Sequence, residues 1–314
     1  MSNPLLDQRA LAEGKALAKL TDRSVIAIDG PDRHKWLHSI LSQALLGLRA
    51  GDSAEALQLD ANGHIEYALH LYEDGERTWA IVERSTKQAL MAWLDRMIFR
   101  SDVTLTDLDD THSVYFGIGT DIGVTWADPW PGVVAGGVRY AAEGFAFNAR
   151  EHILTETPEL PLVDTSAAEP LRIASRRPRQ ATEVDEKSLP HEYDWLATAV
   201  HLSKGCYRGQ ETVAKVHNVG HPPRRLTFLH LDGSNHLLPE ETDVTLDGEV
   251  VGRVTSIGQH YEMGPIALAI LKRSVPEDAV LMVGNCSAAQ EVIVPQSAGK
   301  AANLPPRNLL NGRR

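Results

Sequence analysis

The stretch of the sequence with the most unusual composition is residues 204–211, KGCYRGQE. Lys204 and Arg208 flank Cys206, and positive neighbours favour the thiolate form, so this cysteine would be more reactive than a free thiol. The two glycines would let the backbone approach a flat ligand closely. A purely structural alternative makes Cys206 a small buried hydrophobic residue and the glycines turn residues. Composition alone leaves both interpretations open.

Other patterns that resemble cofactor or metal motifs lack the context that such motifs need. The glycine-rich segment 117–123 has the wrong spacing for a dinucleotide-binding loop and does not lead into a helix. His217 and His221 are four residues apart, but Gly220 and the two prolines that follow argue against a regular helical metal face. No third ligand stands at a familiar spacing. We therefore predict no metal site.

The first hundred residues alternate short strands with amphipathic helices. Residues 24–28 are typical of a strand, and a helix after Pro31 places apolar residues from Trp36 to Leu45 on one face. The Asn-Gly pair at 62–63 lies between apolar runs and predicts a β-hairpin, because both positions accept positive φ. A further strand, a second helix and a final strand follow. This order indicates an α+β fold with a largely antiparallel sheet.

The character of the chain changes after Pro222-Pro223. Short apolar runs then follow one another, separated by turn dipeptides, at residues 226–231, 244–246, 250–257, 266–271 and 280–283. Strands at this density predict a small closed β-barrel. We therefore expect a region of two interlocked subdomains over 1–221, a barrel over 222–296, and a disordered basic tail over 297–314.

Composition limits the class of protein. The net charge is -11 and Lys and Arg form no dense block, so we expect no direct nucleic-acid binding. The two cysteines, Cys206 and Cys286, are too few for a disulfide framework. Charged residues interrupt the apolar residues of the first twenty positions, and no long apolar run follows, so neither a signal peptide nor a membrane span is expected. We predict a reduced, cytoplasmic protein.

Residues 204–211 resemble the signature of the YgfZ-like folate-binding proteins and their mitochondrial relatives in iron–sulfur cluster assembly, a branch of the superfamily that includes the glycine-cleavage T-protein. The resemblance extends over roughly residues 24–295, through weaker elements that occur in the family's order. These elements are Gly30-Pro31-Asp32-Arg33 with Trp36-Leu37, Leu59-Asp60-Ala61-Asn62-Gly63, Arg172-Ile173, Leu189-Pro190-His191-Glu192, Thr212-Val213-Ala214-Lys215-Val216, Gly220 and Arg224-Arg225-Leu226.

The resemblance implies a T-protein-like folate-binding fold, with mostly antiparallel sheets, helices and a C-terminal barrel, and tetrahydrofolate or a one-carbon derivative as the cofactor. A pterin presents an amino group and a ring N–H side by side, and a carboxylate can accept both. We assign this role to Glu192, whose alternative is a carboxylate at a helix start. The flat ring needs an aromatic wall, for which Tyr193, Trp195 and Tyr207 are candidates, although each is also a natural core residue.

The resemblance also implies groups for the rest of the ligand. The glutamyl tail of a folate needs a cation, and Arg172, Lys204 and Arg208 are the candidates. Cys206 is expected near the mouth of the ligand cavity, where Lys204 and Arg208 would keep it partly ionised. The ligand itself is expected where the α+β region and the barrel meet.

One departure from the superfamily bears on catalysis. True aminomethyltransferases carry paired aspartates after the hairpin glycine, where a carboxylate is thought to steer the folate nitrogen and the aminomethyl donor. Here Glu66 keeps one carboxylate on a longer side chain, and Tyr67 replaces the other. Proton transfer is very sensitive to geometry, so this change argues against the glycine-cleavage reaction. Glu66 and Cys206 stay the candidate catalytic residues.

The resemblance therefore implies a tetrahydrofolate-binding accessory factor in maturation or repair of iron–sulfur proteins, including tRNA-modifying enzymes, with iron–sulfur client or assembly proteins as partners. Cys206 would form a mixed disulfide or ligate a cluster transiently, since one cysteine cannot hold a stable cluster alone. Two alternatives stay open. A folate-dependent one-carbon transferase would need Glu66 for turnover. A thiol-redox protein would carry a Cys206 that is ionised at low pH whether or not folate is bound.

Overall fold

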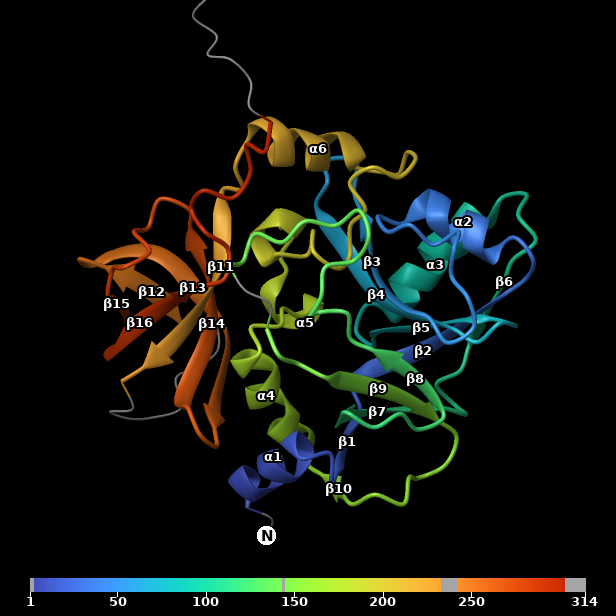
Figure 1. Ribbon diagram of the computed structural model, residues 1–314, viewed down its shortest axis with the longest axis horizontal. Coiled ribbons are helices and arrows are strands. Elements are labelled where there is room, and N and C mark those ends of the chain that lie inside the picture. Colours follow the sequence, from blue (N-terminus) through green and yellow to red (C-terminus); the bar gives the residue numbers. More distant parts are fainter. Residues whose placement is uncertain (1–2, 143–144, 233–241, 303–314) are drawn as a thin grey trace, which may run out of the picture.

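The computed structural model describes residues 3–142, 145–232 and 242–302. These residues form two five-stranded sheets, a closed six-stranded barrel, and helices that pack between and around them (Figure 1). Strand pairing is antiparallel except at one edge, so the predicted α+β class with mostly antiparallel sheets and a C-terminal barrel is confirmed. Within the described ranges, no helix is both long and apolar enough to cross a membrane.

Sheet 1 is built from the first third of the chain. Its strands are β2 (Arg23–Asp29), β3 (Ser53–Leu59), β4 (Ile65–Glu73), β5 (Thr78–Glu83) and β6 (Thr104–Asp107), in the order β3-β4-β5-β2-β6. Helices α2 (Arg33–Ile40) and α3 (Lys87–Ile98) bury their apolar faces against this sheet. Trp36 and Leu37 of α2 and Leu90 and Leu94 of α3 lie in one hydrophobic cluster. The spacing of apolar residues in both helices therefore corresponds to the face that packs on the sheet.

Helix α2 ends at Ile40, earlier than the apolar spacing through Leu45 predicts. The helix does not continue because Ser42, which follows it, forms hydrogen bonds with residues that are distant in the sequence. The N–H of Ser42 donates to the carbonyl of Leu57, and its hydroxyl donates to the carbonyl of Ala199 at 2.6 Å. Leu45 is still fully buried, but in an irregular segment rather than in a helix.

The hairpin predicted at residues 62–63 is present, with a connection of five residues between β3 and β4. Gly63 has φ of +82°, and the carboxylate of Asp60 accepts the N–H groups of Asn62 and His64, each at 2.8 Å. The turn also contacts the KGCYRGQE segment. A Cβ atom at Gly209 would lie 2.6 Å from the carbonyl oxygen of Asp60, so only glycine permits this approach.

Sheet 2 lies beside sheet 1 and is formed largely by the middle of the chain. Its strands are β1 (Leu17–Leu20), β7 (Ser113–Ile118), β8 (Val124–Ala127), β9 (Ala149–Leu154) and β10 (Leu162–Val163), in the order β10-β1-β7-β9-β8. Only the β1–β10 pair is parallel. The indole N–H of Trp126 donates to the carbonyl of Ala54 at 2.9 Å, which ties β8 to β3. The two sheets are thus fixed to each other.

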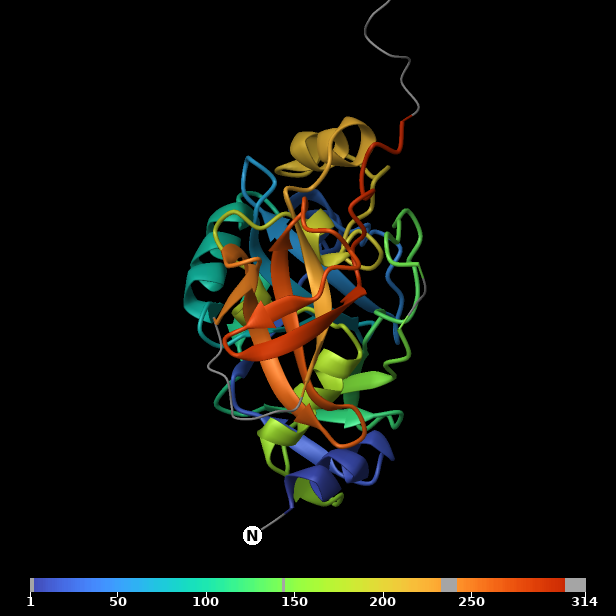
Figure 2. The ribbon, with the colours of Figure 1, turned by 90° about the vertical axis from the view of Figure 1, so that its left-hand side faces the viewer.

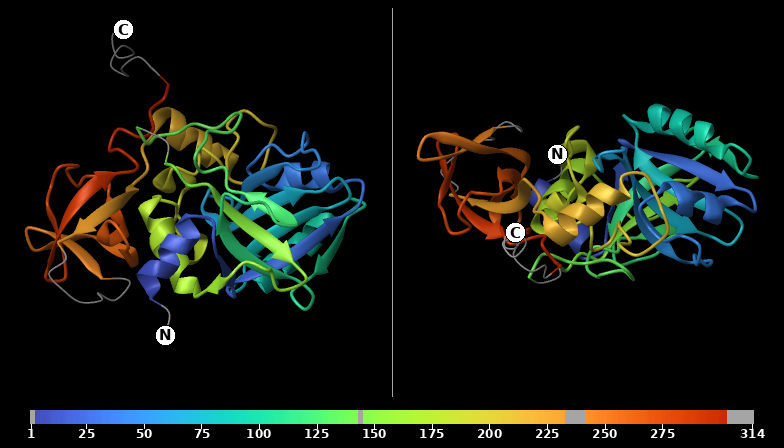
Figure 3. Two further views of the ribbon diagram at one scale, coloured as in Figure 1. Left: turned by 60° about the horizontal axis from the view of Figure 1, so that its bottom comes forward. Right: turned by 90° about the horizontal axis from the view of Figure 1, so that it is seen from above.

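The barrel follows the order β11-β14-β13-β12-β15-β16 and closes by pairing of β16 with β11. Its strands are β11 (Arg224–Leu231), β12 (Asp243–Leu246), β13 (Glu249–His260), β14 (Gly264–Lys272), β15 (Leu281–Val283) and β16 (Cys286–Val292). Figure 2 looks onto the barrel, and Figure 3 shows the sheets and the barrel at opposite ends of the molecule with helices between them. The density of short strands therefore predicted the barrel correctly.

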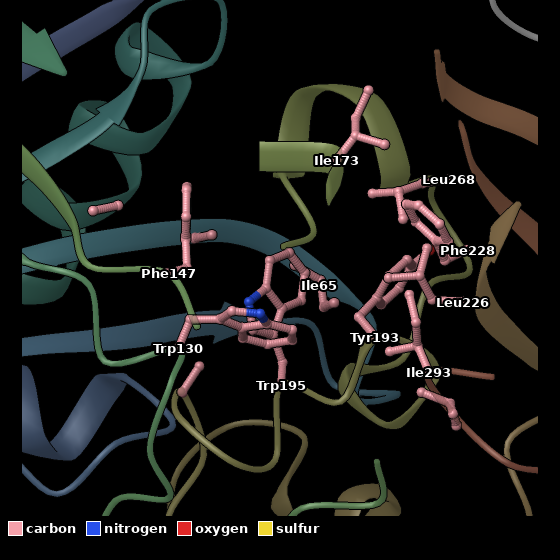
Figure 4. Close-up of a cluster of buried hydrophobic side chains, with 14 of the residues drawn as sticks. Ile65, Trp130, Phe147, Ile173, Tyr193, Trp195, Leu226, Phe228, Leu268 and Ile293 are labelled. Carbon is pink, nitrogen blue, oxygen red and sulfur yellow. The ribbon is translucent and has the colours of Figure 1, made fainter. Parts of the chain in front are cut away.

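Short helices connect the sheets to the barrel. They are α1 (Pro4–Ala12), η1 (Thr165–Ala167), α4 (Ala168–Ala174), α5 (Gln180–Glu183), η2 (Pro190–Tyr193) and α6 (Gln210–Val219). A single hydrophobic cluster runs from Trp195 through Tyr193 and Ile173 to Leu226 and Phe228 of the barrel (Figure 4). Because the barrel and the α+β region share this core, we keep the division at residue 222 as a proposal.

The tail expected to be disordered from residue 297 falls largely on residues 303–314, which lie outside the described residues. Residues 298–302 pack on the end of α6 instead. The N–H groups of Lys300, Ala301 and Ala302 donate to the carbonyls of Gly220, His217 and Asn218 at 2.9–3.0 Å. These carbonyls at the end of α6 need hydrogen-bond donors, so they hold this part of the chain in place although it has little apolar pattern.

Candidate functional site

A central cavity of about 70 Å³ lies between the two sheets and α4. Phe116, Trp126, Phe147 and Trp195 form its apolar walls. The ring of Trp126 stacks on His70, with the ring centroids 3.8 Å apart and the planes 5° from parallel. The central cavity therefore offers flat surfaces to a ring-shaped ligand.

Paired charges line the rest of the central cavity. Glu83 accepts hydrogen bonds from Arg23 and Arg179, with the shortest N–O distance to each at 2.6 Å. Burial opposes ionisation of Glu83, but the two guanidinium groups outweigh it and lower its pKa to about 2. Glu151 lies 2.8 Å from His70 Nδ1, and here too burial is outweighed by His70 and Arg23, which lower the pKa of Glu151 to about 2. Both carboxyls are ionised at neutral pH.

Two buried donors at the central cavity lack an acceptor. Arg177 donates from Nε to Asp128 at 2.9 Å and from Nη2 to Glu55 at 2.7 Å, but its Nη1 has no partner among the described residues. The Nε1 of Trp195 also has none. These side chains are 3% and 1% exposed, so neither donor reaches bulk water. A buried donor without an acceptor costs about 1–3 kcal/mol, which favours a ligand that brings one.

An outer groove of about 670 Å³ adjoins the central cavity. It is lined by Asp60, His64, Ile65, Glu66, Tyr67, Glu83, Ser85, Thr86, Gln180, Ala181, Val184, Asp185 and Glu186. Glu83 and Gln180 line both spaces, so the groove and the cavity meet at these residues. The amide of Gln180 accepts from the N–H of Ala68 at 2.7 Å and donates to the carbonyl of Glu66 at 2.9 Å. Gln180 and Glu83 thus form the boundary between the two spaces.

Glu192 and Tyr193, which the sequence predicted to contact a pterin, form hydrogen bonds with other residues of the protein. Glu192 is completely buried, lines neither space, and accepts three hydrogen bonds from Arg224 at 2.8–3.2 Å. The hydroxyl of Tyr193 donates to the carbonyl of Glu183 at 2.9 Å and bonds the hydroxyl of Ser188 at 2.6 Å. These polar groups already have partners within the protein, so the pterin contacts of Glu192 and Tyr193 stay predictions.

Arg172 connects α4 to the barrel. It donates to Glu169 at 2.5 Å, to Glu183 at 3.0 Å, and to the hydroxyl of Ser256 in β13 at 2.6 Å. The side chain borders the central cavity, but its guanidinium is occupied by these partners. A glutamyl tail would have to displace Glu169 and Glu183 to reach it, and the predicted contact of Arg172 with the tail stays a prediction.

Lys204 points into the protein instead of toward a ligand. Its Nζ donates to the backbone carbonyls of His38, Leu41 and Gln43, the last two at 2.5 and 3.1 Å. Burial lowers the pKa of this ammonium to about 8, so it is still protonated at neutral pH. Lys204 therefore fastens the KGCYRGQE segment to the end of α2, where the helix dipole also favours a cation.

Of the remaining predicted residues, Cys206 and Arg208 are exposed and Tyr207 is buried. Cys206 is exposed and does not line the central cavity or the outer groove. Tyr207 is buried, with its ring 5.0 Å from Lys204 Nζ. Arg208 Nη1 lies 3.5 Å from a carboxylate oxygen of Glu66, and these side chains are 47% and 38% exposed. Of the predicted tail cations, Arg208 alone remains accessible to a ligand.

Sequence reasoning missed the charged residues of the central cavity. His70 and Glu151 stand within strands at spacings that match no motif, and Glu83 ends β5. The one available signal was the cluster of arginines at 176–179, interrupted by a proline, which is dense in charge for a buried segment. Trp195, one of the predicted aromatic wall residues, lines the central cavity.

No family model matches the sequence. Among curated proteins, the chain is similar to a chloroplastic protein of Arabidopsis thaliana provisionally named a transferase, At1g60990, with 24% identity over 298 residues, 84% of this chain and 67% of that protein. It is 22% identical over 287 residues to the tRNA-modifying protein YgfZ of Vibrio atlanticus, covering 84% and 86% of the two chains. It is 24% identical over 299 residues to the mitochondrial iron-sulfur cluster assembly factor IBA57 homolog of Neurospora crassa, covering 86% and 68%.

Among solved structures, the chain resembles the glycine cleavage system aminomethyltransferase T from Bartonella henselae, with a TM-score of 0.73. The identity is 15%, and the match covers 94% of this chain and 89% of the other. At this identity the match concerns the fold, including the C-terminal barrel.

Proposed function

Since this chain is a distant homologue of the YgfZ and IBA57 proteins within the T-protein superfamily, we propose that it binds tetrahydrofolate or a one-carbon derivative and acts as an accessory factor for iron–sulfur proteins. Its clients would include enzymes that modify tRNA, and its partners would be iron–sulfur client or assembly proteins. The cytoplasmic location stays a prediction from the sequence.

The observation that carries folate binding is the central cavity with its two unpartnered donors. A pterin has a ring carbonyl and ring nitrogens that accept hydrogen bonds, which suits Arg177 Nη1 and Trp195 Nε1. It also has an amino group and ring N–H groups, for which the nearest carboxylates are Asp128 and Glu151, although these already pair with Arg177 and His70. Trp126 supplies an aromatic face. The two unpartnered donors of the cavity therefore suit the acceptors at the edge of a pterin.

The size of the central cavity sets a condition on binding. A volume of about 70 Å³ holds several water molecules, since each needs about 10–15 Å³. A pterin is larger, so Gln180 must move aside and join the cavity to the outer groove. The pterin would then occupy the inner space, and the benzoyl-glutamate part would extend into the groove.

Replacing Trp195 with phenylalanine tests this site. The indole N–H has no partner among the described residues, so its removal costs no hydrogen bond, and the free energy of unfolding is expected to fall only through the lost packing volume. Tetrahydrofolate should bind about tenfold more weakly, corresponding to one lost hydrogen bond of about 1.4 kcal/mol. Calorimetric titration and urea unfolding measure the two quantities.

Trp130→Phe is the matched control. Trp130 belongs to the same core but does not line the central cavity, and its Nε1 donates to the carbonyl of Ser175 at 3.0 Å. This variant should lose stability and keep its folate affinity. Equal affinity of Trp195→Phe and the wild type would contradict the assignment of the indole N–H. Absence of tetrahydrofolate binding to the wild type would refute the proposed function.

The position of Glu66 favours the accessory role over a one-carbon transferase. Glu66 lines the outer groove, is 38% exposed and faces Arg208, whereas a catalytic carboxylate needs to lie beside the folate ring. We expect no formation of methylene-tetrahydrofolate from an aminomethyl donor by the wild type or by Glu66→Gln. In cells depleted of this chain, activity of a [4Fe–4S] enzyme should be restored by the wild type and not by Cys206→Ala. Turnover that Glu66→Gln abolishes would establish the transferase instead.

A further inference from the structure

We propose that the outer groove selects folates with a short glutamate tail and discriminates against polyglutamylated forms. This inference rests on the proposed function, because it concerns the part of the ligand that would leave the central cavity. Only Glu83 and Gln180 are shared by the two spaces, so a tail attached to a pterin in the cavity enters the groove beside them.

The lining of the outer groove is negative. Five of its side chains are carboxylates, namely Asp60, Glu66, Glu83, Asp185 and Glu186, and none of the described residues that line it is Lys or Arg. We do not propose that these carboxylates bind a ligand; we propose that they repel the glutamate tail. Each further γ-linked glutamate adds one negative charge to the tail, and the described residues that line this space include no cation.

The arginines that neighbour the groove are already paired. Arg179 donates to Glu83 and to Asp22, and Arg224 donates to Asp185 and Glu192. A polyglutamate could recruit either one only by leaving a partly or fully buried carboxylate without its partner, which is costly.

Two cations that are more accessible than Arg179 and Arg224 lie at the edge of the groove. Arg208 lies 3.5 Å from Glu66, and Arg253, whose side chain is 30% exposed, lies 3.9 Å from Asp185; neither arginine lines the groove. These two cations can compensate the α- and γ-carboxylates of a single glutamate. Against five lining carboxylates they cannot compensate every carboxylate of a longer tail as well, so the groove favours a short tail.

The experiment compares three ligands by calorimetric titration: 6-methyltetrahydropterin, tetrahydrofolate and tetrahydrofolate pentaglutamate. We expect the pentaglutamate to bind at least about threefold more weakly than tetrahydrofolate at low salt, and the difference to shrink at high salt, where exposed charges are screened. The pterin without a tail should show no dependence on salt. Pentaglutamate binding that equals or exceeds that of tetrahydrofolate overturns the inference.

Two charge-reversal variants locate the effect. Glu186→Lys places a cation at the groove and should strengthen pentaglutamate binding by about fivefold or more, with pterin binding unchanged. Glu159→Lys makes the same change of charge at an exposed loop position that does not line the groove, and should have no such effect. Equal effects of the two variants would overturn the inference.

The same titrations separate this inference from the proposed function. If the pterin and tetrahydrofolate bind but the pentaglutamate binds more tightly, folate binding stands and the discrimination by the groove is wrong. If none of the three ligands binds, the proposed function fails and this inference fails with it.

Discussion

Replacing Arg177 with methionine is expected to lower the free energy of unfolding by about 3–5 kcal/mol, because removal of one partner strands buried charges. Arg177 is 3% exposed and pairs with Glu55 at 2.7 Å and Asp128 at 2.9 Å, which are themselves buried. Without the guanidinium these carboxyls either remain ionised in a nonpolar environment or take up protons. Burial already raises the pKa of Asp128, so protonation would begin there. Urea unfolding measures the loss.

Arg9→Met is the control for removal of an arginine. Arg9 pairs with Glu13 on the surface of α1 and its side chain is 66% exposed, so its loss should change stability by less than about 0.5 kcal/mol. Folate binding should be lost in Arg177→Met and retained in Arg9→Met. A loss of stability below about 1 kcal/mol in Arg177→Met would show that the paired carboxyls do not depend on this arginine.

Replacing Lys204 with methionine is expected to lower the free energy of unfolding by about 1–3 kcal/mol. Methionine fills a similar volume but leaves the carbonyls of His38, Leu41 and Gln43 without the donor that they share. The segment that carries Cys206 would then lose its attachment to α2. Amide hydrogen exchange over residues 205–209 should become faster, and urea unfolding should show the change in stability.

The control for Lys204→Met is a substitution in α2, the helix whose C-terminal end Lys204 contacts. Lys35 of α2 is exposed, so Lys35→Met should leave both hydrogen exchange and stability near wild-type values. If Lys204→Met shows unchanged exchange at 205–209, the segment is held by other contacts. The packing of Gly209 against the turn at Asp60 would be the first of these to consider.

The sequence predicted the parts of the fold that depend on neighbouring residues. Alternating turns and apolar runs after Pro222 predicted the barrel, and the Asn-Gly pair predicted the hairpin between β3 and β4. The apolar faces of α2 and α3 were visible because a helix packed on a sheet needs them. The end of α2 was missed, since it is determined by bonds from Ser42 to Leu57 and Ala199.

The candidate site was predicted less completely, because its residues come from distant positions. The signature segment directed attention to Cys206, Lys204 and Arg208, and a cation near a thiol can be inferred from spacing alone. Spacing does not say where a side chain points. Lys204 turns inward to three carbonyls, and Cys206 remains on the surface away from both spaces.

The sequence by itself thus determined the α+β class, the barrel and the segment that links this chain to its relatives. Those features arise from local backbone preference and from apolar periodicity, which a linear sequence records. Only the tertiary structure decided which charges are free. Arg224 and Glu183 lie beside the predicted ligand residues Glu192 and Arg172, whereas in the described part of the chain packing leaves Arg177 and Trp195 each a donor without an acceptor. Hydrogen-bond satisfaction is a property of the whole packed chain, so spacing along the sequence does not encode it.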